Sequence, residues 1–283
     1  MSDKGELFIV GTPIGNLQDI SYRGIEVLTN VDMILAEDTR QTNKLLKNYG
    51  IRQKTVSCHE HNEDKRISDV HKHLEDGSSI ALVSDAGTPL ISDPGYKLVS
   101  EIKKLGYTVR PIPGPCALVA ALSVSGLPSD QFQFKGFLPS KANNRKQIYK
   151  DISSYVGTTI FYESVHRIKG SLEDLIEELG IEREIVLAKE LTKQYENVIK
   201  GTSQEVFQWV NENPDSIKGE YVLLIHGHTP GGNEQELEGA ISLLKDLLPL
   251  LSLNQAVKVV SKHVGIKKNY LYNIALEFKN ENY

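Results

Sequence analysis

Short apolar runs and longer amphipathic stretches follow one another through the first half of the chain. The runs predict buried strands at residues 7–10, 33–36, 55–57, 80–83 and 107–112. The stretches predict helices at residues 22–29, 39–49, 63–75, 94–105 and 115–122. Strands that alternate with helices in this way form a mostly parallel sheet with both faces covered.

A cluster of turn residues at 125–130 marks the end of this first unit. Beyond it, strands are predicted at residues 132–134, 158–162, 184–188, 196–200 and 221–225, and helices at 145–153, 168–178 and 203–211. Some of these strands follow one another without a helix, so the second sheet is predicted to be mixed. A linker at 228–233 precedes three helices, at 237–248, 254–263 and 268–278. The pattern predicts two α/β domains, residues 1–127 and 128–229, and a helical tail, residues 230–283.

The composition is that of an ordinary globular protein, with 40% hydrophobic and 24% charged residues. No run of about 18 apolar residues occurs, so no membrane-spanning helix is expected. The N-terminal residues show no signal-peptide pattern, and the two cysteines, Cys58 and Cys116, are far apart in the sequence. We therefore expect a cytoplasmic protein with two unpaired thiols.

The formal net charge of −5 argues against indiscriminate binding to nucleic acid, but two stretches depart from this average. Residues 135–150 hold five basic residues and no acidic ones, and residues 252–283 hold five lysines against two glutamates. Each stretch is explained equally well by an RNA-binding surface and by a solvated helix face.

Loops after the predicted strands carry the candidate chemistry, because parallel sheets bind ligands at the carboxyl ends of their strands. Residues 84–95, SDAGTPLISDPG, run from an apolar strand into a helix, and residues 112–117, IPGPCA, repeat that design. Their glycines allow close approach of the backbone, so the two loops predict a cradle for a small molecule. Residues 11–16, GTPIGN, match only half of a dinucleotide-binding fingerprint, which argues against a dinucleotide site.

Other polar loops give weaker signals. Charged residues follow a strand in AEDTR at 36–40, and His59 and His61 follow another. The spacing of these histidines fits no common metal motif, so ligand binding or helix capping explains them better. In the second domain, polar groups at 161–167, 188–193 and 219–222 are consistent with a site or with surface ion pairs.

Nine motifs in a fixed order resemble the ribosomal RNA small subunit methyltransferase I family, a branch of the tetrapyrrole methylase superfamily. The motifs are GTPIGN, AEDTR, HEHNE, SDAGTPLISDPG, PIPGPCA, GFLP, FYESVHR, AKELTK and GEYVLLI. The resemblance covers residues 5–226, and the last helices are similar to that family's small helical tail. It implies S-adenosylmethionine as methyl donor, the ribose 2′-oxygen of a cytidine in 16S rRNA of the small ribosomal subunit as acceptor, and a homodimer with the cofactor between the two domains.

The resemblance and the strand-end positions together indicate the site residues. Asp85 is a candidate for the cofactor's ammonium or ribose hydroxyls, while strand ends of the second domain would close over the adenine. The expected cofactor-binding residues are Thr12, Pro13, Asp85, Ala86, Gly87, Thr88, Pro115, Phe161, Tyr162, Glu163 and Leu191. The candidate catalytic residues are Arg40, Glu60, Arg167 and Lys189, with Asp38, His59 and Glu163 as further groups that the sequence does not rank. No metal is expected, because a sulfonium is already an excellent leaving group.

Two other functions stay open at this point. One is a small-molecule methylase that acts on a precorrin or related tetrapyrrole, and the other is a non-catalytic nucleotide-binding or metal-binding module. The basic residues at 135–150 and the tail favour rRNA over a tetrapyrrole. The tail has the outline of a helix-turn-helix with its turn at Gly265, although a packing cap would share that outline.

Overall fold

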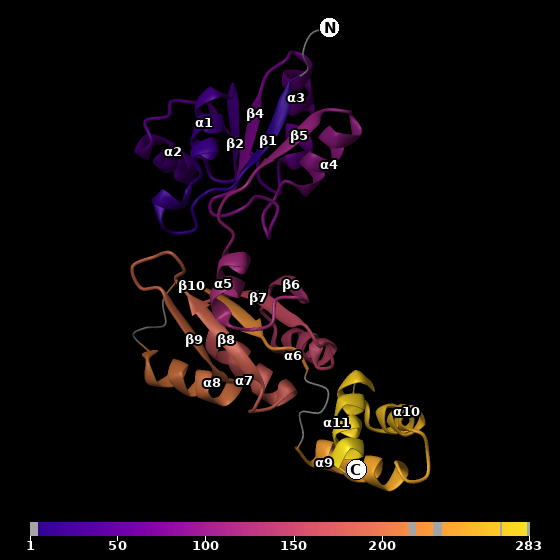
Figure 1. The fold of residues 1–283 in the computed structure, drawn as a ribbon. Coiled ribbons are helices and arrows are strands. Elements are labelled where there is room, and N and C mark those ends of the chain that lie inside the picture. The colour runs from indigo at the N-terminus through magenta and orange to yellow at the C-terminus, as the bar shows by residue number, and fades with distance from the viewer. Residues whose placement is uncertain (1–4, 215–218, 229–233, 267, 282–283) are drawn as a thin grey trace.

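The computed structural model describes residues 5–214, 219–228, 234–266 and 268–281, and Figure 1 shows two sheets and a separate group of C-terminal helices. The first sheet is wholly parallel with strand order β3-β2-β4-β1-β5, which confirms the predicted parallel sheet. Its strands are β1 (Glu6–Val10), β2 (Met33–Ala36), β3 (Thr55–Ser57), β4 (Ile80–Val83) and β5 (Thr108–Ile112).

Helices cover both faces of this sheet because alternate residues of its buried strands point to opposite sides. Leu28 and Leu46 pack with Ile34 on one face, while Val70 and Leu98 join the core on the other. The helices are α1 (Tyr22–Asn30) and α2 (Thr39–Asn48) on the first face, and α3 (Glu63–Glu75) and α4 (Tyr96–Lys104) on the second. A short 3-10 helix, η1 (Leu17–Asp19), follows the loop after β1.

The second sheet is mixed, as predicted, with strand order β6-β7-β10-β8-β9. Only β6 and β7 pair in parallel; the other neighbours are antiparallel. Its strands are β6 (Phe132–Phe137), β7 (Thr158–Ser164), β8 (Glu184–Lys189), β9 (Asn197–Thr202) and β10 (Glu220–Ile225). Helices α6 (Ala142–Ile152), α7 (Ile168–Leu179) and α8 (Ser203–Glu212) enclose the main core on one face.

Helix α5 (Ala117–Ser125) covers part of the other face of the second sheet. Its buried residues Leu118 and Ala121 pack with Ile160, Val186 and other apolar residues of that sheet. The boundary predicted at residue 127 therefore follows a helix that packs with the second domain. The turn residues at 125–130 predicted where α5 ends. They did not predict that α5 packs on the second sheet, because this packing depends on contacts between residues distant in the sequence.

Three helices form the tail, α9 (Glu234–Leu247), α10 (Leu253–Val264) and α11 (Lys268–Glu281). Their apolar side chains, among them Leu244, Val257 and Leu271, form a core to which neither sheet contributes a described residue. Gly265 ends α10 with a φ of +77°, a value that glycine adopts without strain. Of the predicted linker at 228–233, residues 229–233 lie outside the described part of the chain. None of the described helices is long and apolar enough to cross a membrane.

Candidate active site between the two sheets

The loops after β4, β1 and β5 are joined into one cradle at the carboxyl edge of the first sheet. Thr12 and Gly87 exchange backbone hydrogen bonds of 2.8 and 3.0 Å, and the Thr88 hydroxyl donates to the Pro115 carbonyl at 3.0 Å. A β-carbon on Gly11 would lie 2.8 Å from the Cα of Gly114, so the two backbones touch where only glycine fits. The structure thus brings together the two loops that the sequence predicted to form a cradle.

The second domain faces this cradle with the carboxyl ends of β7 and β8 and the amino end of β10. The loop after β8 touches the first domain, because the Asn16 amide donates to the Thr192 hydroxyl at 3.1 Å. The Lys193 ammonium lies 2.9 Å from Glu190 and 3.2 Å from Glu220, which ties this loop to the start of β10.

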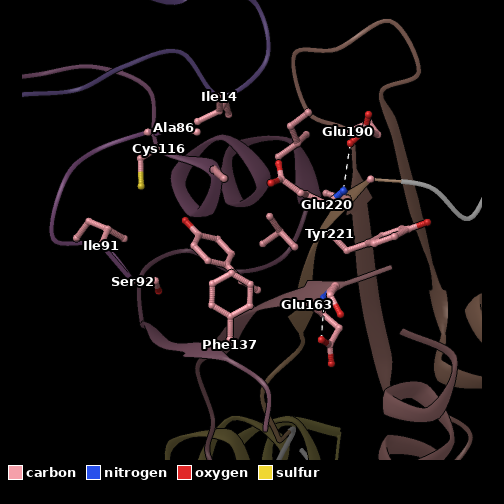
Figure 2. Close-up of a pocket in the computed structure, with 18 of the residues that line it drawn as sticks. Ile14, Ala86, Ile91, Ser92, Cys116, Phe137, Glu163, Glu190, Glu220 and Tyr221 are labelled. Carbon is pink, nitrogen blue, oxygen red and sulfur yellow. Dashed lines mark hydrogen bonds between the residues drawn. The ribbon is translucent and has the colours of Figure 1, made fainter. Parts of the chain in front are cut away.

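A cavity of about 400 Å³ lies between the two domains, within the size range of small-molecule sites. Figure 2 shows Ile14, Ala86, Cys116 and Ile91 on the side of the first domain and α5, with Glu190, Glu220 and Tyr221 facing them. Glu190 accepts a hydrogen bond from the Glu220 amide at 3.1 Å, which closes the far wall.

Backbone strain is concentrated beside this cavity. Among the described non-glycine residues, positive φ angles occur at Leu90, Ser92, Glu190 and Thr192, with values from 50° to 72°. All four lie on the loops after β4 and β8, and Ser92 and Glu190 line the cavity directly. Such conformations cost on the order of 1–3 kcal/mol each and gather at functional sites. The strain therefore marks both walls of the cavity as a candidate ligand site.

Three carboxylates, Glu37, Asp85 and Asp93, line the wall formed by the first sheet. The pKa of Asp93 is raised to about 6, mainly by burial; a hydrogen bond with Ser84 opposes this shift, and repulsion from Glu37 and Asp85 adds to it. Burial also raises the pKa of Glu37, and repulsion from Asp85 adds to this effect. The Asp85 carboxylate accepts a 2.9 Å hydrogen bond from the Asp38 amide. A cationic ligand would relieve the repulsion among these groups.

The second domain also contributes an aromatic and apolar patch to the opposite wall. Tyr162 packs edge-on against Phe134 and Phe137, with ring centroids 4.8 and 5.4 Å apart. Its hydroxyl accepts a hydrogen bond from the Leu118 amide at 3.2 Å, and burial raises its pKa. Together with Leu191, the Tyr162 ring provides the kind of surface that receives a flat heterocycle.

Of the predicted cofactor-binding residues, seven line the cavity: Asp85, Ala86, Gly87, Thr88, Tyr162, Glu163 and Leu191. Thr12 and Pro115 support the cradle from behind through the hydrogen bonds described above. Pro13 adjoins Thr12 without lining the cavity. Phe161 is fully buried in the core on the other face of the second sheet, because it alternates with Tyr162 along β7.

Glu163 borders the cavity, but its carboxylate is committed to the start of α7. It accepts hydrogen bonds from the Ser164 amide at 2.7 Å and the Arg167 guanidinium at 3.0 Å, and from the Ser171 hydroxyl. The side chain of Glu163 is completely buried. These contacts make Glu163 and Arg167 a structural pair at the rim.

The four candidate catalytic residues lie outside the cavity lining. The Arg40 guanidinium is 87% exposed and lies 2.6 Å from Asp38, whose pKa it lowers to about 2. Glu60 is exposed in the turn before α3, and Lys189 is buried at the end of β8. The further candidate His59 contacts Asn62, 3.1 Å away. Arg167 is paired as described above.

The site residues predicted from the sequence do not include six cavity-lining residues with notable side chains, namely Glu37, Asp93, Phe137, Glu190, Lys193 and Glu220. Each of them lies in a quoted motif, so the signal was present in AEDTR, SDAGTPLISDPG, GFLP, AKELTK and GEYVLLI. What the motifs lacked was the direction of each side chain, which depends on the conformation of the loops and on strand register.

Three of the five basic residues in the stretch at 135–150 form ion pairs with acids of α7. Arg145 is buried and lies 2.6 Å from Asp174, and Lys146 lies 2.5 Å from Glu177. Lys150 lies 3.5 Å from Glu178. The sequence concealed these pairs because the acids come from α7, more than twenty residues further along the chain.

Comparisons with known proteins agree with this architecture. A family model described as Tetrapyrrole (Corrin/Porphyrin) Methylases matches residues 6–206, and one described as RsmI C-terminal HTH domain matches residues 234–279. A protein of Vibrio cholerae serotype O1 named "Ribosomal RNA small subunit methyltransferase I" is 49% identical, over 96% of this chain and 94% of its own. Its namesake in Escherichia coli O157:H7 is 47% identical, over 98% and 96%.

Solved structures show the same fold at low sequence identity. A diphthine synthase matches with a TM-score of 0.60 and 17% identity, covering 80% of this chain and 91% of its own. A cobalt precorrin-4 methyltransferase matches with a TM-score of 0.57 and 13% identity, covering 78% and 94%.

Proposed function

This chain belongs to the ribosomal RNA small subunit methyltransferase I family of the tetrapyrrole methylases, and from that premise we propose that it transfers a methyl group from S-adenosylmethionine to ribosomal RNA. The acceptor we propose is the ribose 2′-oxygen of a cytidine in the 16S rRNA of the small ribosomal subunit. The observation that carries the proposal is the cavity of about 400 Å³ whose strained loops come from both domains.

The chemistry of the cavity fits S-adenosylmethionine. Its ammonium and sulfonium carry positive charge, which complements Glu37, Asp85 and Asp93. Its adenine requires a flat apolar surface, which Tyr162 and Leu191 supply. The backbone of Ala86–Thr88 comes within reach of a ligand because Gly87 bears no side chain.

When bound, S-adenosylmethionine supplies a methyl group already activated by the sulfonium. The residues of this chain then have to orient the cofactor and the acceptor, exclude water from the cavity and accept a proton from the acceptor hydroxyl. A ribose hydroxyl is a very weak acid, and a positioned carboxylate with a raised pKa assists its deprotonation. We propose Glu37 or Asp93 for this task, because both line the cavity with raised pKa values. Arg40, Glu60, Arg167 and Lys189 lie outside the cavity lining, and we propose that they support the acceptor.

The proposal extends to partners and location. We propose that the protein acts in the cytoplasm on the small ribosomal subunit and forms a homodimer. The exposed lysines Lys258, Lys262 and Lys268 of the helix-turn-helix tail support contact with RNA phosphates.

Calorimetry with S-adenosylmethionine, followed by methyl transfer to small subunits isolated from a strain lacking the enzyme, tests this function. Mass spectrometry of digested 16S rRNA should find a new 2′-O-methylcytidine. Cofactor binding without transfer to RNA, together with methylation of a precorrin or uroporphyrinogen, would instead support the small-molecule alternative.

A further inference from the structure

An irregularity in β6 directs Phe137 toward the cavity. Phe134 pairs with Ile160 and Phe137 with Tyr162, so three residues of β6 span the distance that two residues of β7 span. Gly136, with a φ of +71°, accommodates the extra residue. In a regular strand, residues three apart point to opposite faces, whereas here both phenylalanines contact the Tyr162 ring. The bulge therefore re-aims Phe137.

A buried arginine holds the loop that follows Phe137. The Arg145 guanidinium donates to the carbonyls of Pro139 at 3.1 Å and Ser140 at 2.9 Å. The same side chain donates to the Asp174 carboxylate at 2.8 Å, which anchors the loop to α7. Because these bonds are formed inside the protein, the position of Phe137 is set before any ligand binds.

Despite this fixed position, Phe137 remains 56% exposed. It lines the cavity on the same side as Ser92, as Figure 2 shows, and its ring packs edge-on against Tyr162. More than half of this large aromatic side chain is therefore accessible at the rim of the cavity. The exposed face of the Phe137 ring can therefore stack against a planar group of a ligand that enters the cavity from solvent.

Two free positive charges flank the same segment. Lys135 and Lys141 are both exposed, and neither forms an ion pair with another residue in the part of the chain that the structure describes. They contrast with Arg145 and Lys146, which acids of α7 neutralise. Lys135 and Lys141 precede and follow Phe137 in the sequence, and sites for single-stranded nucleic acid combine such aromatic rings, on which bases stack, with basic residues near the phosphates.

We propose that the ring of Phe137 is the platform on which the base of the methylated nucleotide stacks. This inference rests on the proposed function. A ribose can reach the cavity only when its nucleotide leaves the RNA stack, and the lost base stacking must be replaced. Phe137 replaces it at the rim, which places the attached ribose next to the cavity.

Steady-state methylation of small subunits by a variant series tests the platform. Replacing Phe137 by Ala or Leu should raise the KM for the subunit about tenfold, since one stacked base contributes roughly that much. Phe137→Trp should restore a KM near that of the wild type, because a larger flat ring still stacks. Calorimetry on each variant should find an unchanged Kd for S-adenosylmethionine, and thermal melting checks the fold.

Phe132 is the matched control, because it lies at the other end of β6, is 45% exposed and does not line the cavity. Phe132→Ala should leave the KM and the Kd unchanged. The platform is refuted if Phe137→Ala keeps the wild-type KM, if Phe137→Leu rescues it, or if the Kd for the cofactor rises in parallel. A wild-type protein that does not methylate the subunit would contradict the proposed function instead, so the two failures are distinguishable.

Discussion

At Gly87, both the backbone conformation and the access of a ligand to the cradle require a residue without a side chain. Its φ is +83°, and its backbone pairs with that of Thr12. A β-carbon added at Gly87 would lie 3.4 Å from Cγ2 of Ile14 and 3.7 Å from the carbonyl oxygen of Pro115. A valine would strain the backbone and fill the approach to the cradle. We therefore expect Gly87→Val to abolish measurable S-adenosylmethionine binding in calorimetry.

Gly106 provides a matched control for this substitution. It has the same φ of +83°, but nothing lies within 4 Å of its missing side chain. Gly106→Val should lower thermal stability through backbone strain alone and leave cofactor affinity intact. Equal affinity in the two variants would show that the cradle does not contact the cofactor.

The raised pKa of Asp93 leads us to expect that cofactor affinity depends on pH. Its pKa of about 6 lies above the ordinary carboxyl value, mainly because of burial, so its ionisation destabilises the fold as pH rises from about 4 through 6. A bound cation favours the ionised form and thereby releases a proton. Affinity for S-adenosylmethionine should therefore rise between pH 5 and about 7 and then level off.

The contribution of Asp93 is separable from that of its neighbours by calorimetry across this pH range. Asp93→Asn should flatten the pH dependence, leaving only the part due to Glu37, whose pKa is also raised. S-adenosylhomocysteine lacks the sulfonium charge and should show a weaker dependence with the wild-type protein. A wild-type affinity that falls with rising pH would contradict the role of Asp93 as a partner of the cofactor's positive charge.

At the scale of elements, the contact between α6 and α7 contains one buried ion pair. The side chains of Arg145 and Asp174 are only 8% and 10% exposed, and Arg145 also satisfies two loop carbonyls. Removing one charge leaves the other buried without a partner, which costs about 3–5 kcal/mol. Arg145→Met should therefore lower the free energy of unfolding by roughly that amount in denaturant titrations.

Two further variants separate burial from charge in this contact. Lys146→Met removes a partly exposed pair with Glu177 and should cost less than about 1 kcal/mol. The double variant Arg145→Met/Asp174→Leu should recover much of the loss of Arg145→Met, because no unpaired charge remains buried. A small effect of Arg145→Met alone would mean that the pair is solvated in solution.

For the whole molecule, the tail has a core of its own and a separable role. Its apolar residues, such as Ala240, Val260 and Ala275, pack only with other tail residues among those described. Deleting residues 230–283 should therefore leave the melting temperature of the two-sheet body and its cofactor affinity nearly unchanged. Affinity for the small subunit should fall, and its dependence on salt should weaken as phosphate contacts are lost.

A sharper variant keeps the tail folded. Lys258 and Lys262 are exposed one helical turn apart on α10, so Lys258→Glu/Lys262→Glu reverses charge without touching the core. It should reproduce the loss of subunit affinity caused by the deletion. A fall in melting temperature on deletion, with unchanged RNA affinity, would instead identify the tail as a packing cap.

Local patterning was sufficient to predict the α/β class, the parallel and mixed sheets and the helical tail. Apolar runs, helical periodicity and turn residues are local signals that a few neighbouring positions determine. The glycine-bearing motifs after β4 and β5 were sufficient to predict the cradle. The same motifs contained Glu37, Asp93 and Phe137, although they did not identify these side chains as lining a cavity.

Tertiary structure decided which side chains reach that cavity. Tyr162 faces it and Phe161 does not, because successive residues of a strand point to opposite faces and the sequence leaves the choice of face open. The bulge in β6 directs Phe137 toward the cavity. Arg145 is buried because it forms an ion pair with Asp174 of α7. Each of these outcomes depends on contacts between residues distant in the chain, which local patterns do not encode.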